Sequence, residues 1–330
     1  MIHETRPYVS TGQLPSPVDV RQIVERAHML VRDNTEGERS QVYPALARAQ
    51  EDLFGICIAA TNGETYGVGD MNHEFTLMSI SKPFVFALIC EQIGPAVARQ
   101  KLGVNATGSA FNSAAPLERN PGGHTNPMVN SGAMATTSLA PGDSAADKWD
   151  FLRAGLSEFA GRELALDDEV FASASTTNFR NRGLAQILHG LGGIYCDPME
   201  AVDLYTRQCC LNVTARDLAV MGATLASGGV NPVTRQRVID PLVCHHTLAV
   251  MATAGLYETS GDWLYEIGLP GKSGISGGIV AVSPGKGGLG TFAPLLDTAG
   301  NSIKGQLVAK YLSQHLGLDL FVSSPAQTSG

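Results

Sequence analysis

Strand-like segments lie near both ends of this 330-residue chain, and the long middle part has a mostly helical pattern. Residues 54–60 are continuously apolar, as in a buried strand, and Asn62-Gly63 then predicts a tight turn into a second strand at 64–68. Strand signals return only at 277–282 and 289–292. A sheet built from both chain ends, with a helical region inserted between its halves, accounts for this order.

Helical spacing of apolar residues supports the same layout. The chain predicts a buried helix beginning near Ser79, a long loop at 105–126, and further helices at 18–31, 128–139, 147–159, 182–191, 198–207, 215–226, 241–254 and 301–316. We therefore predict an α/β (α+β) fold with an antiparallel sheet flanked by helices.

The predicted organisation is one domain, residues 15–330, with a flexible arm at one end and a flexible tail at the other. Its sheet subdomain covers about 15–75 and 255–320, and an all-helical subdomain covers about 76–254. Residues 1–14 are the predicted arm and 323–330 the predicted tail.

Composition excludes several classes of partner. The net charge is −8 and the chain has no Lys/Arg run, so nucleic acid and anionic membrane surfaces are not expected to bind. No signal peptide and no apolar run of membrane-spanning length are recognised. The six scattered cysteines predict free thiols in the cytoplasm, with no metal site. Gly287-Gly288-Leu289-Gly290 lacks a following helix, so no dinucleotide cofactor is expected.

Ser79 and Lys82 are the first candidates for chemistry. Three positions apart, they would share one helical face about one turn from each other. Serine needs a neighbouring base to act as a nucleophile, and a lysine whose charge is disfavoured by burial can be that base. Alternatively, Ser79 or Ser81 caps the helix and Lys82 is an ordinary first-turn residue.

A second motif, Lys272-Ser273-Gly274, precedes the predicted strand at 277–282. A Ser-x-x-Lys helix beside a Lys-Ser/Thr-Gly segment at a sheet edge is the pairing of serine β-lactamases and penicillin-binding proteins. The strand of such a site offers a backbone N–H to an oxyanion, and its lysine adds positive potential. The Ser-Asp-Asn element of those families is absent, so a lactamase is not the best fit.

Longer stretches resemble the bacterial serine-dependent glutaminases, which share the β-lactamase-type fold. The resemblance runs in the family's order over roughly residues 25–315 and is carried by segments 42–47, 79–82, 126–133, 179–182, 204–209, 255–257 and 271–278. Of these, Asn-Pro-Met-Val-Asn-x-Gly-Ala is highly specific. The resemblance implies a β-lactamase-like serine hydrolase that converts L-glutamine to L-glutamate and ammonia without a cofactor, as a homodimer or homotetramer.

The resemblance also implies a role for each matching residue. Ser79 would be the nucleophile, Lys82 its activating base, and Tyr257 would assist proton transfer to the leaving ammonia. The backbone N–H groups of Ser79 and Ile275 would form the oxyanion hole, with Lys272-Ser273-Gly274 in support. The residues expected to bind the substrate are Tyr43, Asn130, Asn181, Tyr205 and Tyr257.

Most of these substrate-binding residues also have a structural interpretation. Tyr43 and Tyr205 occupy helical positions and could be core aromatics. Asn130 and Asn181 could be helix N-caps. Only the joint match favours binding of a small zwitterion by neutral amides and phenols, which donate to a carboxylate and accept from an ammonium group.

Two positions depart from the family pattern. Met78 replaces a glutamine, and Ala174, seven residues before Asn181, replaces a glutamate that pairs with the substrate α-ammonium. Losing such a charged partner costs about 2–4 kcal/mol of binding. Acidic residues near this position that could substitute for it are Glu163, Asp167, Asp168 and Glu169.

These sequence observations are consistent with three functions. The first is a glutaminase, the second a related serine amidohydrolase for a small amide without a free α-ammonium, and the third a non-catalytic binding protein on the same fold. Retention of Ser79, Lys82, Tyr257 and the Lys272 motif speaks against the third.

Overall fold

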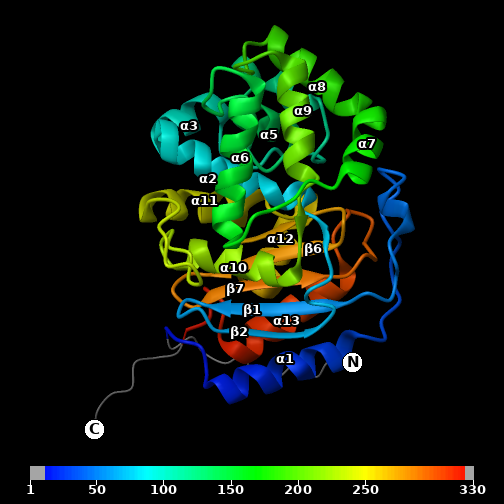
Figure 1. The fold of residues 1–330 in the computed structure, drawn as a ribbon, viewed down its shortest axis with the longest axis vertical. Coiled ribbons are helices and arrows are strands. Elements are labelled where there is room, and N and C mark those ends of the chain that lie inside the picture. Colours follow the sequence, from blue (N-terminus) through cyan, green and yellow to red (C-terminus); the bar gives the residue numbers. More distant parts are fainter. Residues whose placement is uncertain (1–11, 324–330) are drawn as a thin grey trace.

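The computed structural model describes residues 12–323, and its centre is a five-stranded antiparallel sheet (Figure 1). The strand order is β2 (Thr65–Gly69), β1 (Gly55–Ala60), β7 (Gly287–Phe292), β6 (Gly278–Ser283) and β5 (Gly271–Ser273). The early strand β1 pairs directly with the late strand β7, with Ile58 opposite Leu289, so the sheet is built from both chain ends, as the sequence predicts. The turn at Asn62-Gly63 closes the β1–β2 hairpin as expected.

Helices cover both faces of this sheet (Figure 1). On one face lie α1 (Pro17–Val31) and α13 (Ile303–Leu316), whose apolar side chains share a core cluster with Ile56 and Ile279. On the other face lies α10 (Ala215–Ala226), which packs against Cys57 and its neighbours. Alternate residues of each strand point to opposite faces, so the continuously apolar strands serve both layers.

A helical layer lies beyond α10, on the side of the molecule away from α1 (Figure 1). It contains α2 (Ser81–Ile93), α3 (Pro95–Leu102), α4 (Ala115–Arg119), α5 (Asn130–Thr137), α6 (Ala145–Ala160), α7 (Asp168–Thr177), α8 (Phe179–Gly190) and α9 (Pro198–Cys209). The chain then returns to the sheet through α10, α11 (Pro241–Ala254) and α12 (Ser260–Ile267). Single 3-10 turns are η1 (Leu46–Arg48), η2 (Met78–Ile80), η3 (Pro121–Gly123) and η4 (Tyr257–Thr259).

The prediction that residues of about 76–254 are all helical is wrong in one respect, because this region contains a short strand. The region is also not separate from the sheet. Strand β3 (Phe75–Thr76) pairs with β4 (Asn212–Val213) at its base. Two residues are too few to show the alternating pattern of a strand. Moreover, α10 is buried along nearly its whole length because it lies between the sheet and the other helices.

Helices α10 and α11 begin and end at the predicted residues. Helices α3, α4, α7 and α12 are not predicted, and α4 lies inside the segment predicted as a long loop. Helix α7 reads Asp-Glu-Val-Phe-Ala-Ser-Ala-Ser-Thr-Thr, and its Ser and Thr residues favour helices weakly. Residues 1–11 of the predicted arm and 324–330 of the predicted tail lie outside the described residues.

The glycine-rich segment of β7 allows α10 to approach the sheet closely. A Cβ on Gly290 would lie 2.0 Å from the carbonyl oxygen of Ala215, and one on Gly288 would lie 2.3 Å from that of Ala219. Both obstacles are backbone atoms, which cannot move aside without shifting the helix. The segment rejected above as a dinucleotide motif therefore has a packing role.

Gly290→Ala is expected to lower the free energy of unfolding by about 2–3 kcal/mol, because α10 must move away from β7. Urea unfolding followed by circular dichroism measures this change. Gly183→Ala in α8 is the matched control, since its new Cβ meets open space; it should be neutral or stabilising by up to about 1 kcal/mol. Equal stability of Gly290→Ala and wild type would contradict the close packing.

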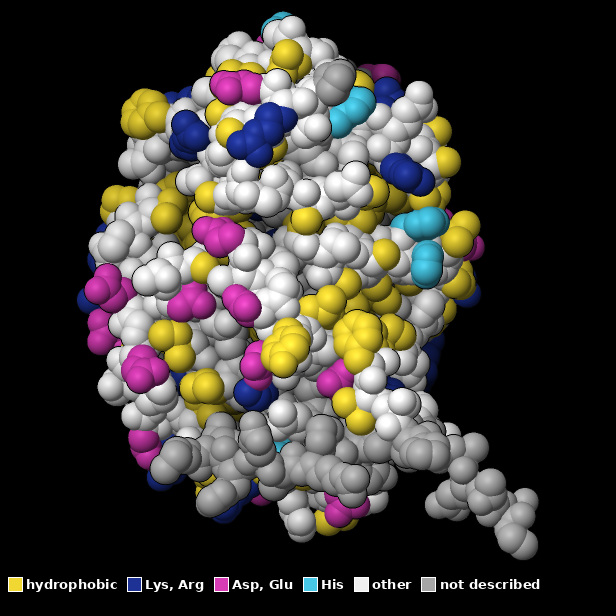
Figure 2. Space-filling model, turned by 180° about the vertical axis from the view of Figure 1, so that it is seen from behind, with side chains coloured by type: hydrophobic (Ala, Val, Ile, Leu, Met, Phe, Trp, Pro, Cys, Tyr) yellow, Lys and Arg dark blue, Asp and Glu magenta, His cyan; other side chains and the backbone are white. Residues whose placement is uncertain are grey.

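Charged side chains of both signs are distributed over the surface (Figure 2). On the face shown in Figure 2, acidic side chains are scattered, and Lys and Arg do not merge into a continuous basic surface. Among residues 12–323, no single helix is long and apolar enough to cross a bilayer. Residues Met78–Ile93 and Pro95–Leu102 reach that length only together, and they bend by 119° between them.

Candidate active site

Ser79 lies in the 3-10 turn η2, which leads directly into α2. Ser79 and Lys82 are therefore about one turn apart, as predicted, but across a junction of two helix types. The alternative that Ser79 or Ser81 caps α2 is wrong, because α2 has no side-chain cap and the Ser81 hydroxyl donates back to the Met78 carbonyl at 2.9 Å.

Lys82 is a buried amine without an acidic partner among the described residues. Its Nζ donates to Asn130 Oδ1 at 2.7 Å and lies 5.9 Å from the centre of the Tyr205 ring. Burial in this neutral environment lowers the pKa of Lys82 to about 7. A large fraction of Lys82 is thus neutral near physiological pH, in the form that can accept a proton.

A chain of hydrogen bonds connects Lys82 to the predicted substrate-binding amides. Asn130 Oδ1 also accepts from the Tyr205 hydroxyl at 3.1 Å, and Asn130 Nδ2 donates to Asn181 Oδ1 at 3.0 Å. Asn130 is the first residue of α5 and Asn181 lies inside α8, and neither side chain caps its helix. Tyr205 projects from α9, whereas Tyr43 lies in a turn before η1 and not in a helix as predicted.

Tyr257 and the Lys272 motif lie beside the Ser79 turn. Lys272 and Ser273 of the motif belong to the edge strand β5, and Gly274 follows it directly. Burial raises the pKa of Tyr257 to about 12, and its hydrogen bond with Ser79 opposes that increase. Lys272 Nζ donates to the Ser273 carbonyl at 2.7 Å and lies 4.3 Å from the Tyr257 ring centre.

The expectation that Lys272 adds positive potential stays a prediction. Lys272 is completely buried, and burial together with nearby Lys82 holds its pKa well below its ordinary value. Lys272 contacts both the ring of Tyr257 and the end of β5, so it fixes their relative position. Gly274 lets β5 approach η2, since a Cβ there would lie 3.1 Å from the Leu77 carbonyl oxygen.

Two residues of this site have a left-handed backbone. Met78, immediately before Ser79, has φ 48°, and Tyr257 has φ 57°. Non-glycine residues adopt this conformation rarely and at a cost of order 1–3 kcal/mol, and such strain concentrates at functional sites. The surrounding structure therefore holds the backbone at Met78 and Tyr257 in this strained form, with the side chains of Ser79 and Tyr257 in contact.

One narrow pocket of about 40 Å³ collects the predicted residues. It is lined by Val42, Tyr43, Met78, Ser79, Phe111, Asn130, Ala174, Asn181, Tyr205, Thr206, Cys209, Cys210 and Ile275. Tyr257 borders it through its contact with the Phe111 ring, 4.6 Å between ring centres. The Ile275 N–H has no hydrogen-bond partner among residues 12–323, so it remains available to an oxyanion.

Some residues of the site are not recognisable from the sequence. Phe111 comes from the long loop, where only the loop's length is a signal. Asn301 is fully buried, accepts from the Ser273 hydroxyl at 2.5 Å and donates to Thr259 at 3.0 Å, so it joins β5 to the turn that carries Tyr257. No sequence pattern distinguishes Asn301 from an ordinary turn residue.

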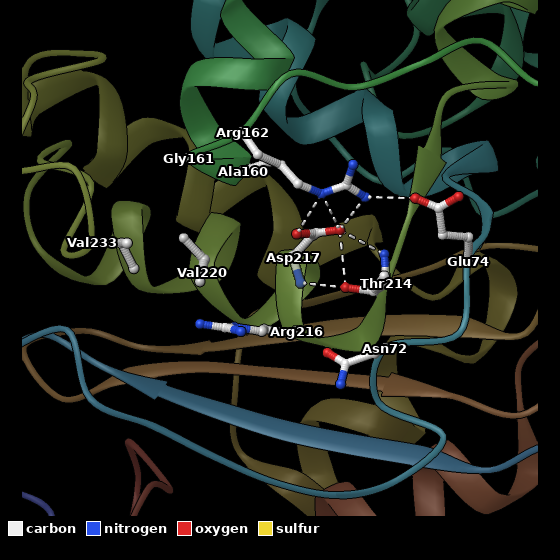
Figure 3. A pocket seen from close by; sticks show the side chains of 10 residues that line it. All are labelled: Asn72, Glu74, Ala160, Gly161, Arg162, Thr214, Arg216, Asp217, Val220 and Val233. Atoms are coloured by element: carbon white, nitrogen blue, oxygen red, sulfur yellow. Dashed lines mark hydrogen bonds and ion pairs between the residues drawn. The ribbon is translucent and has the colours of Figure 1, made fainter.

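A larger cavity, about 480 Å³, lies elsewhere, beside the first turn of α10 (Figure 3). Arg162 bonds both carboxylate oxygens of Asp217 at 2.8–3.1 Å and reaches Glu74 at 3.2 Å. Asp217 also accepts from Thr214 as a helix cap. These groups satisfy one another and no nucleophile faces them, so cavity size does not identify the reactive site.

Comparisons with known proteins agree with this geometry. The glutaminase family matches residues 37–321. "Glutaminase 2" of Yersinia pestis is 66% identical over 318 residues, covering 96% of this chain and 94% of that protein. The glutaminase of Mycobacterium ulcerans (strain Agy99) is 45% identical over 302 residues, covering 92% and 94%.

Solved structures show the same fold. The "Probable glutaminase ybaS" has a TM-score of 0.92 and 41% identity, covering 94% of this chain and all of that one. A covalent complex of the Bacillus subtilis glutaminase YbgJ with 5-oxo-L-norleucine has a TM-score of 0.81 and 31% identity, covering 92% and 99%. This chain therefore belongs to the glutaminase family.

Proposed function

We propose that this protein is a glutaminase that hydrolyses the side-chain amide of L-glutamine to L-glutamate and ammonia. The observation that carries this proposal is the buried Lys82, with a pKa near 7 and no acidic partner among the described residues, one turn from a serine hydroxyl that lines the pocket. An amine in that state can take the serine proton at neutral pH. The family relationship supports glutamine as the substrate.

In the proposed mechanism, Lys82 accepts the Ser79 proton while Ser79 Oγ attacks the amide carbon. The resulting oxyanion receives hydrogen bonds from the Ser79 and Ile275 N–H groups. When the C–N bond breaks, the nitrogen takes a proton from Lys82 through the Tyr257 hydroxyl and leaves as ammonia. Water, activated by Lys82, then hydrolyses the Ser79 ester to release L-glutamate.

Tyr43, Asn130, Asn181, Tyr205 and Tyr257 are the proposed substrate-binding residues. All but Tyr257 line the pocket directly, and Tyr257 hydrogen-bonds Ser79 at its edge. The juxtaposition of the Ser79 turn with the Lys272-Ser273-Gly274 edge strand supports the finer assignment of a β-lactamase-like serine hydrolase fold.

The alternative of a binding protein without catalysis has less support. A protein that only binds gains nothing from burying a lysine without an acidic partner, because desolvation disfavours its charged form. The strained backbone at Met78 and Tyr257 also needs a function to retain it. Whether another small amide is a substrate depends on whether the pocket makes a charged contact with the substrate's amino group.

The test is chemical labelling combined with ammonia release. Incubation with 6-diazo-5-oxo-L-norleucine should add one adduct, which peptide mass spectrometry places on Ser79, and the unlabelled enzyme should release ammonia from millimolar L-glutamine. Ser81→Ala should be labelled as wild type is. An adduct elsewhere, or ammonia release that persists after complete labelling, would contradict the proposed acyl-enzyme.

A homodimer or homotetramer and a cytoplasmic location also stay proposals. Exposed large side chains such as Phe179, Tyr265 and Phe321 support association with further copies. The six cysteines are all free thiols, which supports a reducing compartment.

A further inference from the structure

The pocket at Ser79 has no carboxylate. None of its lining residues among the described part of the chain is Asp or Glu, and the wall contributed by α7 is the methyl group of Ala174. The four acidic residues offered as substitutes do not line the pocket, and Asp168 is exposed at the start of α7. Asp167 caps α7 by accepting from the Val170 N–H at 2.9 Å, Glu169 pairs with Arg48, and Glu163 pairs with Arg153.

The titratable groups of the pocket do not supply an anion either. Burial raises the pKa values of Tyr43, Tyr205, Cys209 and Cys210, so these phenols and thiols are neutral near pH 7. Lys82, which hydrogen-bonds Asn130 beside the pocket, becomes positive and not negative when its charge changes. A substrate ammonium in this pocket would lose its hydration without gaining an opposite charge.

Hydrogen-bond donors, in contrast, are available. Lys82 donates to Asn130 Oδ1, which directs Asn130 Nδ2 toward Asn181 Oδ1. Asn181 Nδ2 consequently points away from Asn130, and neither it nor the Tyr43 hydroxyl has a partner among residues 12–323. Two free donors suit a carboxylate, which accepts hydrogen bonds only.

We infer that this site binds its substrate through the carboxylate and the carboxamide and makes no charged contact with the α-amino group. The inference rests on the proposed glutaminase function and widens its substrate class. Alongside glutamine, the site takes short ω-carboxamides of carboxylic acids that lack an α-ammonium, of which glutaramate (glutamine without its amino group) is the simplest. Ala174 is the residue that determines this tolerance.

The test compares ammonia release from L-glutamine and glutaramate by wild type, Ala174→Glu and Ala174→Gln. Wild type should show kcat/KM values for the two amides within about tenfold of each other. Ala174→Glu should shift the ratio toward glutamine by roughly thirty- to a thousandfold, the effect of restoring one charged hydrogen bond. Ala174→Gln has the same length without the charge and should leave the ratio within about threefold.

Two results would overturn the inference: a wild-type preference for glutamine above a hundredfold, or an equal shift with Ala174→Gln. Absence of ammonia from both amides would instead overturn the proposed function. Binding then decides the inference separately, by calorimetry of Ser79→Ala with glutarate and L-glutamate. Comparable dissociation constants support it, and a preference for L-glutamate above a hundredfold contradicts it.

Discussion

Ser79→Ala is expected to reduce kcat for glutamine hydrolysis by about four to six orders of magnitude while the chain stays folded. The serine oxygen forms the covalent bond to the substrate, and losses of this size follow removal of a nucleophile in other acyl-enzyme hydrolases. Ser79 lines the pocket, and its hydroxyl contact is with Tyr257, so its removal leaves the core packing intact. Steady-state ammonia release, with the melting temperature measured in parallel, checks both halves of the expectation.

Ser81→Ala is the matched control. Ser81 is also buried and lies only two residues away, but its hydroxyl bonds the Met78 carbonyl and Gln208 and does not line the pocket. We expect a loss of about 1 kcal/mol in stability and little change in kcat. Residual activity of Ser79→Ala above about one percent, or a loss in Ser81→Ala as large as in Ser79→Ala, would contradict the role assigned to Ser79.

The sheet and the reactive residues are predictable from the sequence for different reasons. Strand β1 is continuously buried, so its apolar run shows in the sequence, and Asn62-Gly63 marks the hairpin turn. Ser79 and Lys82 are three residues apart, and local spacing survives the change from an α-helix to a 3-10 turn. Their convergence with Asn181 and Tyr205 follows from the family resemblance and not from any local pattern.

Other parts of the site depend on tertiary structure. Phe111 reaches the pocket because its loop packs over Tyr257, and Asn301 is buried because two distant turns meet there. The lowered pKa of Lys272 is not predictable from its motif, because it follows from complete burial and from the nearby Lys82. Burial is a property of the whole fold, and no short motif encodes it.

The activity should depend on pH through Lys82. Since the neutral amine is the base, kcat/KM for glutamine should fall about tenfold per pH unit below pH 7 and level off above it, following the pKa of about 7. Lys82→Arg should be inactive throughout, because a guanidinium keeps its proton. Rates from pH 5 to 9 test this, and a flat wild-type profile or an active Lys82→Arg would contradict it.

Lys82→Met should separate activity from stability. In wild type the pKa of Lys82 is about 7 when folded and near 10.5 when unfolded, so the unfolded chain binds more protons between these values and stability rises with pH across that window. Below pH 7 the buried charge costs its full penalty. At pH 6 the inactive Lys82→Met should therefore be more stable by about 2–4 kcal/mol, a gain that shrinks toward pH 10.

Asn130 Oδ1 still accepts from Tyr205 in this variant, so no buried acceptor is left unsatisfied. Urea unfolding at pH 6 and pH 9 measures the difference, and a variant less stable than wild type at pH 6 would show that Lys82 is not an uncompensated buried cation.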